Sequence, residues 1–115
     1  MAVKRHDPGP RMSQAVESGS TVYLAGLVAD DAALYVKGQT KQILAKIDKL
    51  LAKAGTDKSK ILSANIWLTD IGTWSQMNEV WDAWVSPGNA PARATVEAKL
   101  AGPGLKVEIM VQAAK

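Results

Sequence analysis

Two stretches of the sequence repeat hydrophobic positions with the 3.6-residue period of an α-helix. The first runs from Gln39 to Ala54, and Gly55 follows it where a left-handed cap belongs. In the second, Thr73 and Gln76 fit a capping box, and the pattern continues until SPGNAP at 86–91 stops it. Each stretch predicts a helix with one buried stripe. The stripes are Ile43, Leu44, Ile47, Leu50, Leu51 and Ala54 in the first helix, and Trp74, Met77, Trp81 and Trp84 in the second.

The remaining hydrophobic segments alternate with a period of two, which is typical of half-buried strands. Residues 11–29 hold two short strand-like runs joined by ESGS, which reads as a hairpin. Three longer strands are predicted over 61–70, 93–100 and 105–113. We expect one apolar face made of Leu62, Ala64, Ile66 and Leu68, of Ala94, Val96, Ala98 and Leu100, and of Leu105, Val107, Ile109, Val111 and Ala113. The opposite face would carry Ser63, Asn65, Trp67 and Thr69, then Arg93, Thr95, Glu97 and Lys99, then Lys106, Glu108, Met110 and Gln112.

The order of elements, β-β-α-β-α-β-β, predicts a single α+β domain over residues 1–115. Both one-sided helices would cover the apolar face of one sheet. The other sheet face would then be left without a covering element, although it carries Trp67 and Met110 among polar side chains. A face of this kind favours self-association into a closed ring, with candidate sites in the clefts between subunits.

Composition narrows the possible chemistry. The chain has 47% hydrophobic residues, and we expect a soluble, cytoplasmic protein with no membrane partner, because no apolar run is long enough to cross a bilayer and the N-terminus lacks a signal-peptide stretch. With no cysteine, the chain can form no disulfide, thiolate zinc site or cysteine nucleophile. With His6 as its single histidine, a histidine-based metal cluster or a serine–histidine pair within one subunit is nearly excluded. We therefore expect no metal and no other cofactor. His6 itself is interpreted as a residue of an N-terminal tail.

The net charge of +3 is mild, and the lysines lie mainly along the first helix, where charges usually mark the solvated face. Without interleaved aromatic residues this stripe does not indicate nucleic-acid binding. The segment GPGLK at 102–106 lacks the ending of a phosphate-binding loop and is interpreted as a hairpin turn.

Arg93 and Glu108 are the strongest candidates for chemistry. Pro91 places the start of a strand near Arg93, and the alternation puts both charged residues on the uncovered face, where they can share a site. A guanidinium is a planar fork that fits a carboxylate, and a carboxylate can orient or deprotonate a water molecule. The alternative from the pattern alone is an ion pair that merely closes a sheet face.

Several segments then identify a resemblance that spans Arg11 to Ala114. The segments RMSQAV, VYLAG, GQTKQILAKIDKLLAKAG, KILSANIWLTDI, MNEVWDAWV, PARATVEAKL and KVEIMVQAA follow one another in the order and approximate spacing of the Rid family, also called YjgF-like or L-PSP endoribonuclease-like proteins. The most specific parts are the PAR element and the VE strand, which fall on Arg93 and Glu108.

The resemblance implies a chorismate-mutase-like subunit in a homotrimer, whose sheets form a central barrel with three clefts between neighbours. It also implies cofactor-independent hydrolysis of 2-imino or enamine acids to 2-keto acids and ammonia, as in a 2-iminobutanoate/2-iminopropanoate deaminase. Arg93 would hold the substrate carboxylate and Glu108 would position the water. Gly26 would line the pocket with three residues that depart from the best-known deaminases, namely Met12 in place of a tyrosine, Ala25 in place of a serine and Thr95 in place of a cysteine.

Two other functions stay open at this point. The same arginine would serve a non-catalytic binder or sensor of small carboxylic acids. The older family name suggests an RNA-cleaving or translation-inhibiting protein, but the sequence offers no general-acid histidine for RNA cleavage.

Overall fold

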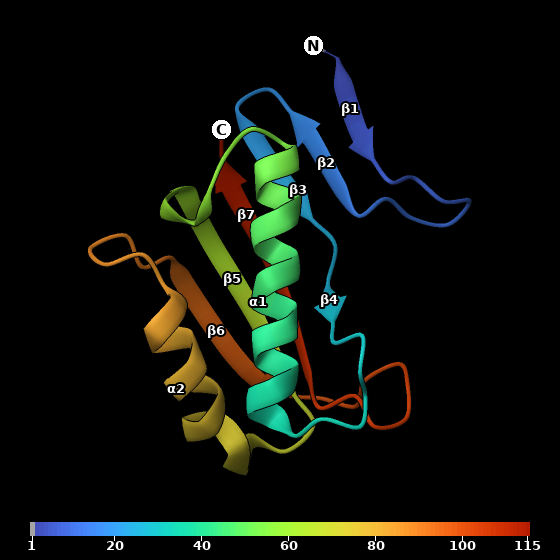
Figure 1. The fold of residues 1–115 in the computed structure, drawn as a ribbon. Helices are drawn as coiled ribbons and strands as arrows, with labels where there is room; N and C mark the ends of the chain where they lie inside the picture. The colour runs from blue at the N-terminus through green and yellow to red at the C-terminus, as the bar shows by residue number, and fades with distance from the viewer. Residues whose placement is uncertain (1) are drawn as a thin grey trace.

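A mixed sheet carries two α-helices on one of its faces (Figure 1). The structure is a computed structural model that describes residues 2–115. It confirms the predicted fold class, with two more strands than the sequence indicates, β1 and β4. The elements are β1 (Val3–His6), β2 (Ala15–Ser18), β3 (Thr21–Leu24), β4 (Leu27–Val28), α1 (Val36–Lys53), β5 (Ile61–Leu68), α2 (Trp74–Trp84), β6 (Ala92–Glu97) and β7 (Val107–Ala114), with short 3₁₀ turns η1 (Lys58–Lys60) and η2 (Ile71–Thr73).

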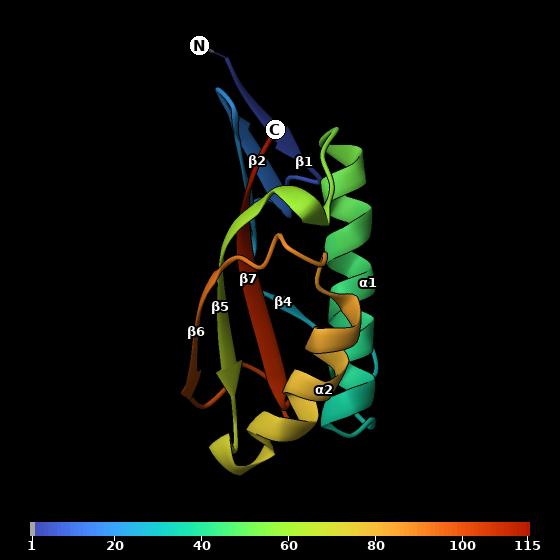
Figure 2. The same cartoon turned by 90° about the vertical axis from the view of Figure 1, so that its left-hand side faces the viewer.

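The sheet has seven strands in the order β1-β2-β3-β7-β5-β6, with β4 also paired to β7. The strand β7 is central and antiparallel to β3, β4 and β5, whereas β6 pairs in parallel with β5 at one edge. A parallel pair needs a crossover connection, and α2 provides it. Seen edge-on, both helices lie on one side of the sheet (Figure 2). We call the opposite side the outer face; it carries Asn65, Trp67, Glu108, Met110 and Gln112.

The core forms between the sheet and the helices. Along β7 the buried residues alternate with half-buried ones, as the sequence predicts, so that Ile109 faces the helices while Glu108 and Met110 face outward. The predicted apolar stripe of α1 is also buried in this core, through Ile43 and Ile47 among others. None of the helices within residues 2–115 is long and apolar enough to cross a membrane.

Four local predictions are wrong. Trp74, a member of the predicted buried stripe of the second helix, is 50% exposed. The strand β5 has a register shift between Ile61 and Ser63, which turns Leu62 outward and leaves it 53% exposed. The capping box is not formed, because the Thr73 hydroxyl donates to the carbonyl of Asp70 instead (2.7 Å). The segment 102–106 does turn, but it is not a hairpin, since β5 lies between β6 and β7.

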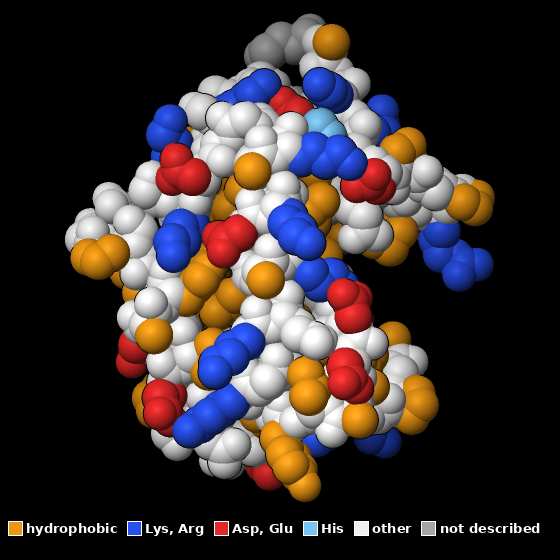
Figure 3. All heavy atoms as spheres, in the orientation of Figure 1, with side chains coloured by type: hydrophobic (Ala, Val, Ile, Leu, Met, Phe, Trp, Pro, Cys, Tyr) orange, Lys and Arg blue, Asp and Glu red, His pale blue; other side chains and the backbone are white. Residues whose placement is uncertain are grey.

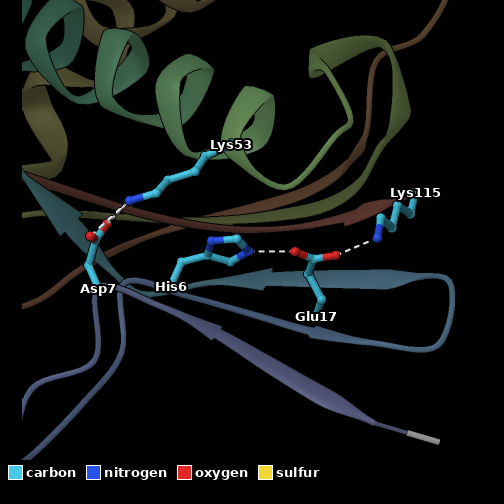
Figure 4. Close-up of polar contacts among 5 residues, drawn as sticks. All are labelled: His6, Asp7, Glu17, Lys53 and Lys115. Atoms are coloured by element: carbon cyan, nitrogen blue, oxygen red, sulfur yellow. Dashed lines mark hydrogen bonds and ion pairs between the residues drawn. The ribbon is translucent and has the colours of Figure 1, made fainter.

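The N-terminal segment is a strand and not the tail that its proline and glycine content suggests. Val3 to His6 pair with Ser18 to Ala15, so β1 forms an edge of the sheet. The His6 side chain is only 6% exposed and bonds the carboxylate of Glu17, which is also paired with Lys115 at 2.5 Å (Figure 4). A second ion pair, Asp7 to Lys53 at 2.8 Å, joins the end of β1 to α1 (Figure 4).

Candidate functional site

Glu108 lies in the middle of the outer face. The strands beside β7 place Trp67 of β5 and Val28 of β4 directly across from it. Its side chain is half-buried, and no ion pair within residues 2–115 involves it. A carboxylate without an internal partner is available to accept a hydrogen bond or a proton from a bound molecule.

Gly26 is in direct contact with this carboxylate. A Cβ atom added at Gly26 would lie 2.3 Å from Oε2 of Glu108 and 3.2 Å from its Cδ, so only glycine permits the observed approach. Gly26 belongs to the short connection between β3 and β4. The structure thus brings together two of the residues predicted for the site.

Ala25, the neighbouring candidate, behaves differently. Its side chain packs against the hydrophobic core, and its backbone N–H donates to the carbonyl of Gln14 at 2.9 Å. Ala25 therefore fixes the connection to β2 through its backbone, and the predicted substrate contact through its side chain is not supported by this placement.

Arg93 lies on the opposite face of the sheet from Glu108. In the parallel pair of β5 and β6, Arg93 aligns with Ala64 and Thr95 with Ile66, both of which are buried beneath the helices. Trp67, which is paired with Glu108, aligns instead with Val96. The prediction that Arg93, Thr95 and Glu108 share the uncovered face within one chain is wrong.

The register of β6 explains the error. The strand lies at the sheet edge and pairs only with β5, so its facing is set by that single partner. On the helix side, the guanidinium carbon of Arg93 lies 5.3 Å from the ring centroid of Trp81, which is a cation–π geometry. The outward residues are Ala94 and Val96, and Val96 is 50% exposed. Because small and polar residues alternate along β6, its hydrophobic pattern is too weak to decide which residues face the helices.

Two buried oxygen atoms accompany Arg93 on the helix side. Thr95 Oγ1 and Asn78 Oδ1 are inaccessible, and neither has a hydrogen-bond partner within the described residues 2–115. Thr95 follows Arg93 on the same face of β6, and Asn78 lies one turn before Trp81 on α2. A buried unpaired oxygen costs free energy, so each of these two atoms lacks the polar partner that such an atom usually has. The sequence pattern did not single out Asn78. Its place next to Met77 of the predicted apolar stripe indicates a polar side chain near the core.

Met12 lies in the β1–β2 loop and is 49% exposed. Its carbonyl accepts a hydrogen bond from the N–H of Gly9 at 2.8 Å. Of the predicted site residues, the structure therefore groups Gly26 with Glu108 and Arg93 with Thr95, and it leaves Met12 on an exposed loop. No group of three or more potential metal-ligating residues occurs within residues 2–115.

Comparison with known proteins identifies the family to which this fold belongs. Residues 4–115 match the family described as Endoribonuclease L-PSP. The RutC family protein YoaB of Escherichia coli K12 is 44% identical over 115 residues, 99% of each chain. A RutC family protein of Haemophilus ducreyi is 45% identical over 112 residues, 97% of this chain and 96% of the relative.

Solved structures agree with this match. The crystal structure of a YjgF family member from Neisseria meningitidis is 43% identical and has a TM-score of 0.97. The match covers 100% of this chain and 96% of that one. A Yersinia pestis protein described as a member of the conserved Rid family is 32% identical with a TM-score of 0.88, over 94% of this chain and 90% of that one. The protein belongs to the Endoribonuclease L-PSP family, the YjgF or Rid proteins, and the resemblance inferred from the sequence is confirmed.

Proposed function

We propose that the protein is a homotrimeric, cofactor-independent deaminase that hydrolyses small 2-imino acids to 2-keto acids and ammonia in clefts between its subunits. The observation that carries this proposal is the separation of Arg93 and Glu108 onto opposite faces of one sheet. A single chain cannot direct both groups at one small molecule. Two neighbouring chains can, if the outer face of one chain packs near the β6 edge of the next.

The open outer face supports such an assembly. Trp67 and Met110 lie there beside Asn65 and Glu108, with both helices on the other side of the sheet. Partly apolar faces of this kind are commonly covered by subunit contacts, and a ring of identical contacts leaves no sheet face open to further association. The edge strand β6 brings Arg93 to the margin of the same chain, where a neighbouring subunit would meet it.

The chemistry requires only two charged groups. Arg93 pairs with the substrate carboxylate through its two-pronged guanidinium. Glu108 accepts a proton from a water molecule as its oxygen attacks the imine carbon, and the resulting carbinolamine then expels ammonia once its nitrogen has been protonated. The imine is replaced by a ketone with water consumed and ammonia released, so no oxidant or reductant is needed. Holding an already electrophilic substrate near one carboxylate is sufficient for such a step.

The direct test generates an imino acid in situ with an amino-acid oxidase and measures the release of ammonia and keto acid above the spontaneous rate. We expect acceleration by the parent protein and its near-complete loss in Glu108→Gln, in which the amide is nearly isosteric but cannot act as a base. Calorimetric titration with 2-ketobutyrate should show binding in both proteins. Binding without turnover in the parent would instead identify a carboxylic-acid sensor. An RNA-cleaving activity that survives extensive purification and exceeds deamination would overturn the proposal.

Mixed rings test the shared cleft separately. Arg93→Ala and Glu108→Gln should each be inactive alone, but co-expressed subunits will form clefts that combine an intact arginine from one chain with an intact glutamate from its neighbour. Random assembly of rings of three then restores about one quarter of the parent activity. If the separately purified trimers are mixed without unfolding, no recovery is expected. The absence of recovery in verified mixed trimers would place both groups of each site in one chain.

A further inference from the structure

A hollow lies between the two helices, on the side of the molecule away from the outer face. It has a volume of about 320 Å³. In the space-filling view of this side, hydrophobic side chains are visible between the helices, with charged side chains around them (Figure 3). The hollow is at the lower end of the volumes typical of small-molecule sites. It is lined by Lys41, Leu44, Ala45 and Asp48 of α1, by Val80, Ala83 and Trp84 of α2, and by Lys58 of η1.

The floor of the hollow is apolar and fixed by the core. Leu44 is 2% exposed, and Val80 and Trp84 are partly buried and pack against the core cluster. Two alanines, Ala45 and Ala83, line the hollow from the two helices. Their small side chains leave the space between the helices unfilled, so a bound apolar group would contact preformed walls.

Contacts with Trp84 occupy the charged groups at one end. The indole Nε1 of Trp84 donates to Asp48 Oδ2 at 3.0 Å. The Lys58 ammonium donates to the Trp84 carbonyl at 2.6 Å and lies 5.2 Å from its ring centroid. These contacts fix the Trp84 ring as one wall of the hollow. Asp48, the only acidic residue among those that line the hollow, is thereby already hydrogen-bonded.

Lys41 differs from Lys58, because within residues 2–115 its ammonium takes part in no ion pair and has no contact like those of Lys58 with Trp84. The charge of Lys41 contributes to the lowered pKa of Glu79, but it is the smallest cause, and the bond from Lys37 is the largest. Glu79 is paired with Lys37 at 2.6 Å. An available cation therefore stands beside an apolar hollow, and the lining as a whole carries one more positive than negative charge.

We propose that this inter-helix hollow binds a small organic anion with an apolar body, such as a medium-chain or aryl carboxylic acid. The carboxylate pairs with Lys41, and the body lies on Leu44, Val80 and the ring of Trp84. The charge excess and the engaged Asp48 select against cationic ligands of the same shape. The site differs from the proposed deaminase cleft, because Glu108 lies on the far face of the sheet and Arg93, although it is on the helix side against Trp81, does not line the hollow.

Octanoate below its micellar concentration is a suitable probe, with 1-octanol and octylammonium as matched neutral and cationic molecules. In a ¹⁵N-labelled sample of the trimer or monomer, whichever forms, we expect chemical shift changes at the amides of Leu44, Ala45 and Val80 and at the Trp84 indole. Octanoate should bind roughly fivefold more tightly than octanol, the size of one solvent-exposed ion pair. Octylammonium should bind more weakly than either.

Variants distinguish octanoate binding in this hollow from binding elsewhere on the protein. Lys41→Gln should bring octanoate affinity down to that of octanol without changing octanol binding, whereas Lys49→Gln, on the same helix but outside the lining, should change neither. Ala83→Leu fills the opening at an exposed helical position and should abolish binding of both probes with little change in melting temperature. Undiminished octanoate binding in both Lys41→Gln and Ala83→Leu, or no binding at millimolar octanoate, would overturn the proposal. Displacement of bound octanoate by 2-ketobutyrate would also overturn it, because the two acids would then share the cleft.

Discussion

The carboxylate of Glu108 lies where the side chain of residue 26 would begin, since a Cβ atom at Gly26 would come within 2.3 Å of Oε2. The atom in conflict is the far end of a flexible side chain, so an added methyl group can displace it without disturbing the sheet. This contact makes the position of the proposed base depend on one glycine. It also means that the position of the base can be changed while the fold is retained.

Gly26→Ala should therefore lower kcat/KM for imine hydrolysis on the order of 10- to 100-fold, because a base displaced by about 1 Å loses its alignment with the water. The melting temperature should change little. Gly102→Ala is a control, because its Cβ would meet only the end of the Leu105 side chain, at 3.1 Å. Equal activity of both variants would show that the contact does not set the position of Glu108.

Substitutions of Arg93 should separate binding from folding. Arg93→Lys should bind 2-ketobutyrate poorly, because an ammonium lacks the two-pronged geometry of a guanidinium, and Arg93→Ala should lose both binding and deamination. The stacking on Trp81 contributes only about 0.5–1 kcal/mol, so unfolding free energies should remain close to that of the parent. Calorimetry and a sizing run on the same samples check both points. Dissociation of Arg93→Ala into monomers would make the arginine an assembly residue.

A charge on the outer face should prevent assembly. Met110→Lys introduces an ammonium beside Asn65 on the surface that we propose to be covered by neighbouring subunits. Burying that charge without a partner is costly, so analytical ultracentrifugation should find a folded monomer near 12.2 kDa. Tyr35→Lys replaces a residue that is 82% exposed just before α1 and should leave the assembly unchanged. A parent protein that is monomeric at micromolar concentration would contradict the proposed trimer.

Glu17 should make the fold sensitive to acid. Its bond to Lys115, followed by its bond to His6, lowers the pKa of the Glu17 carboxyl from 4.5 to about 2 (Figure 4). The folded state therefore favours the ionised form, and the resulting stabilisation is complete above pH 4.5 and is lost as the pH falls toward 2.

Urea midpoints of the parent and Glu17→Gln should accordingly differ most near neutral pH and converge between pH 4.5 and 2. The carboxyl groups of Asp57 and Glu79 also have lowered pKa values, but both are retained in the variant and cancel in the comparison. Glu79→Gln removes an exposed pair and should show a smaller difference at neutral pH. A gap between the two curves that stays constant down to pH 2 would contradict the role of Glu17.

The sequence indicates the helices and β7 well because their buried positions are large and aliphatic. Residues such as Ile47 and Ile109 recur with a clear period, and only one orientation of the helix or strand buries all of them. The strand β6 lacks that signal, since Ala94 and Thr95 differ little in the free energy gained on burial. Its facing depends on the parallel pairing with β5, which is a tertiary contact.

The errors at Leu62 and His6 have similar causes. A register shift within β5 inverts the alternation at Leu62, and nothing in the local pattern marks the shift. His6 is buried through its bond to Glu17, which is eleven residues away in another strand. A short segment rich in proline and glycine gives no sign of such pairing. Predicting the proposed two-chain site at Arg93 from the sequence requires both the correct facing of β6 and knowledge of a neighbouring subunit.

The central position of β7 also constrains how the protein is made. The strand β7 follows the other strands in the sequence, and it pairs with β3 and β4 on one side and with β5 on the other. The β1–β4 strands and the β5–β6 pair therefore cannot join into one sheet before β7 is available. Until β7 emerges, β3 and β5 each present an unpaired edge next to apolar side chains, which is the condition that promotes aggregation. Removing residues 107–115 should therefore make the product insoluble, whereas removing Lys115 alone should not.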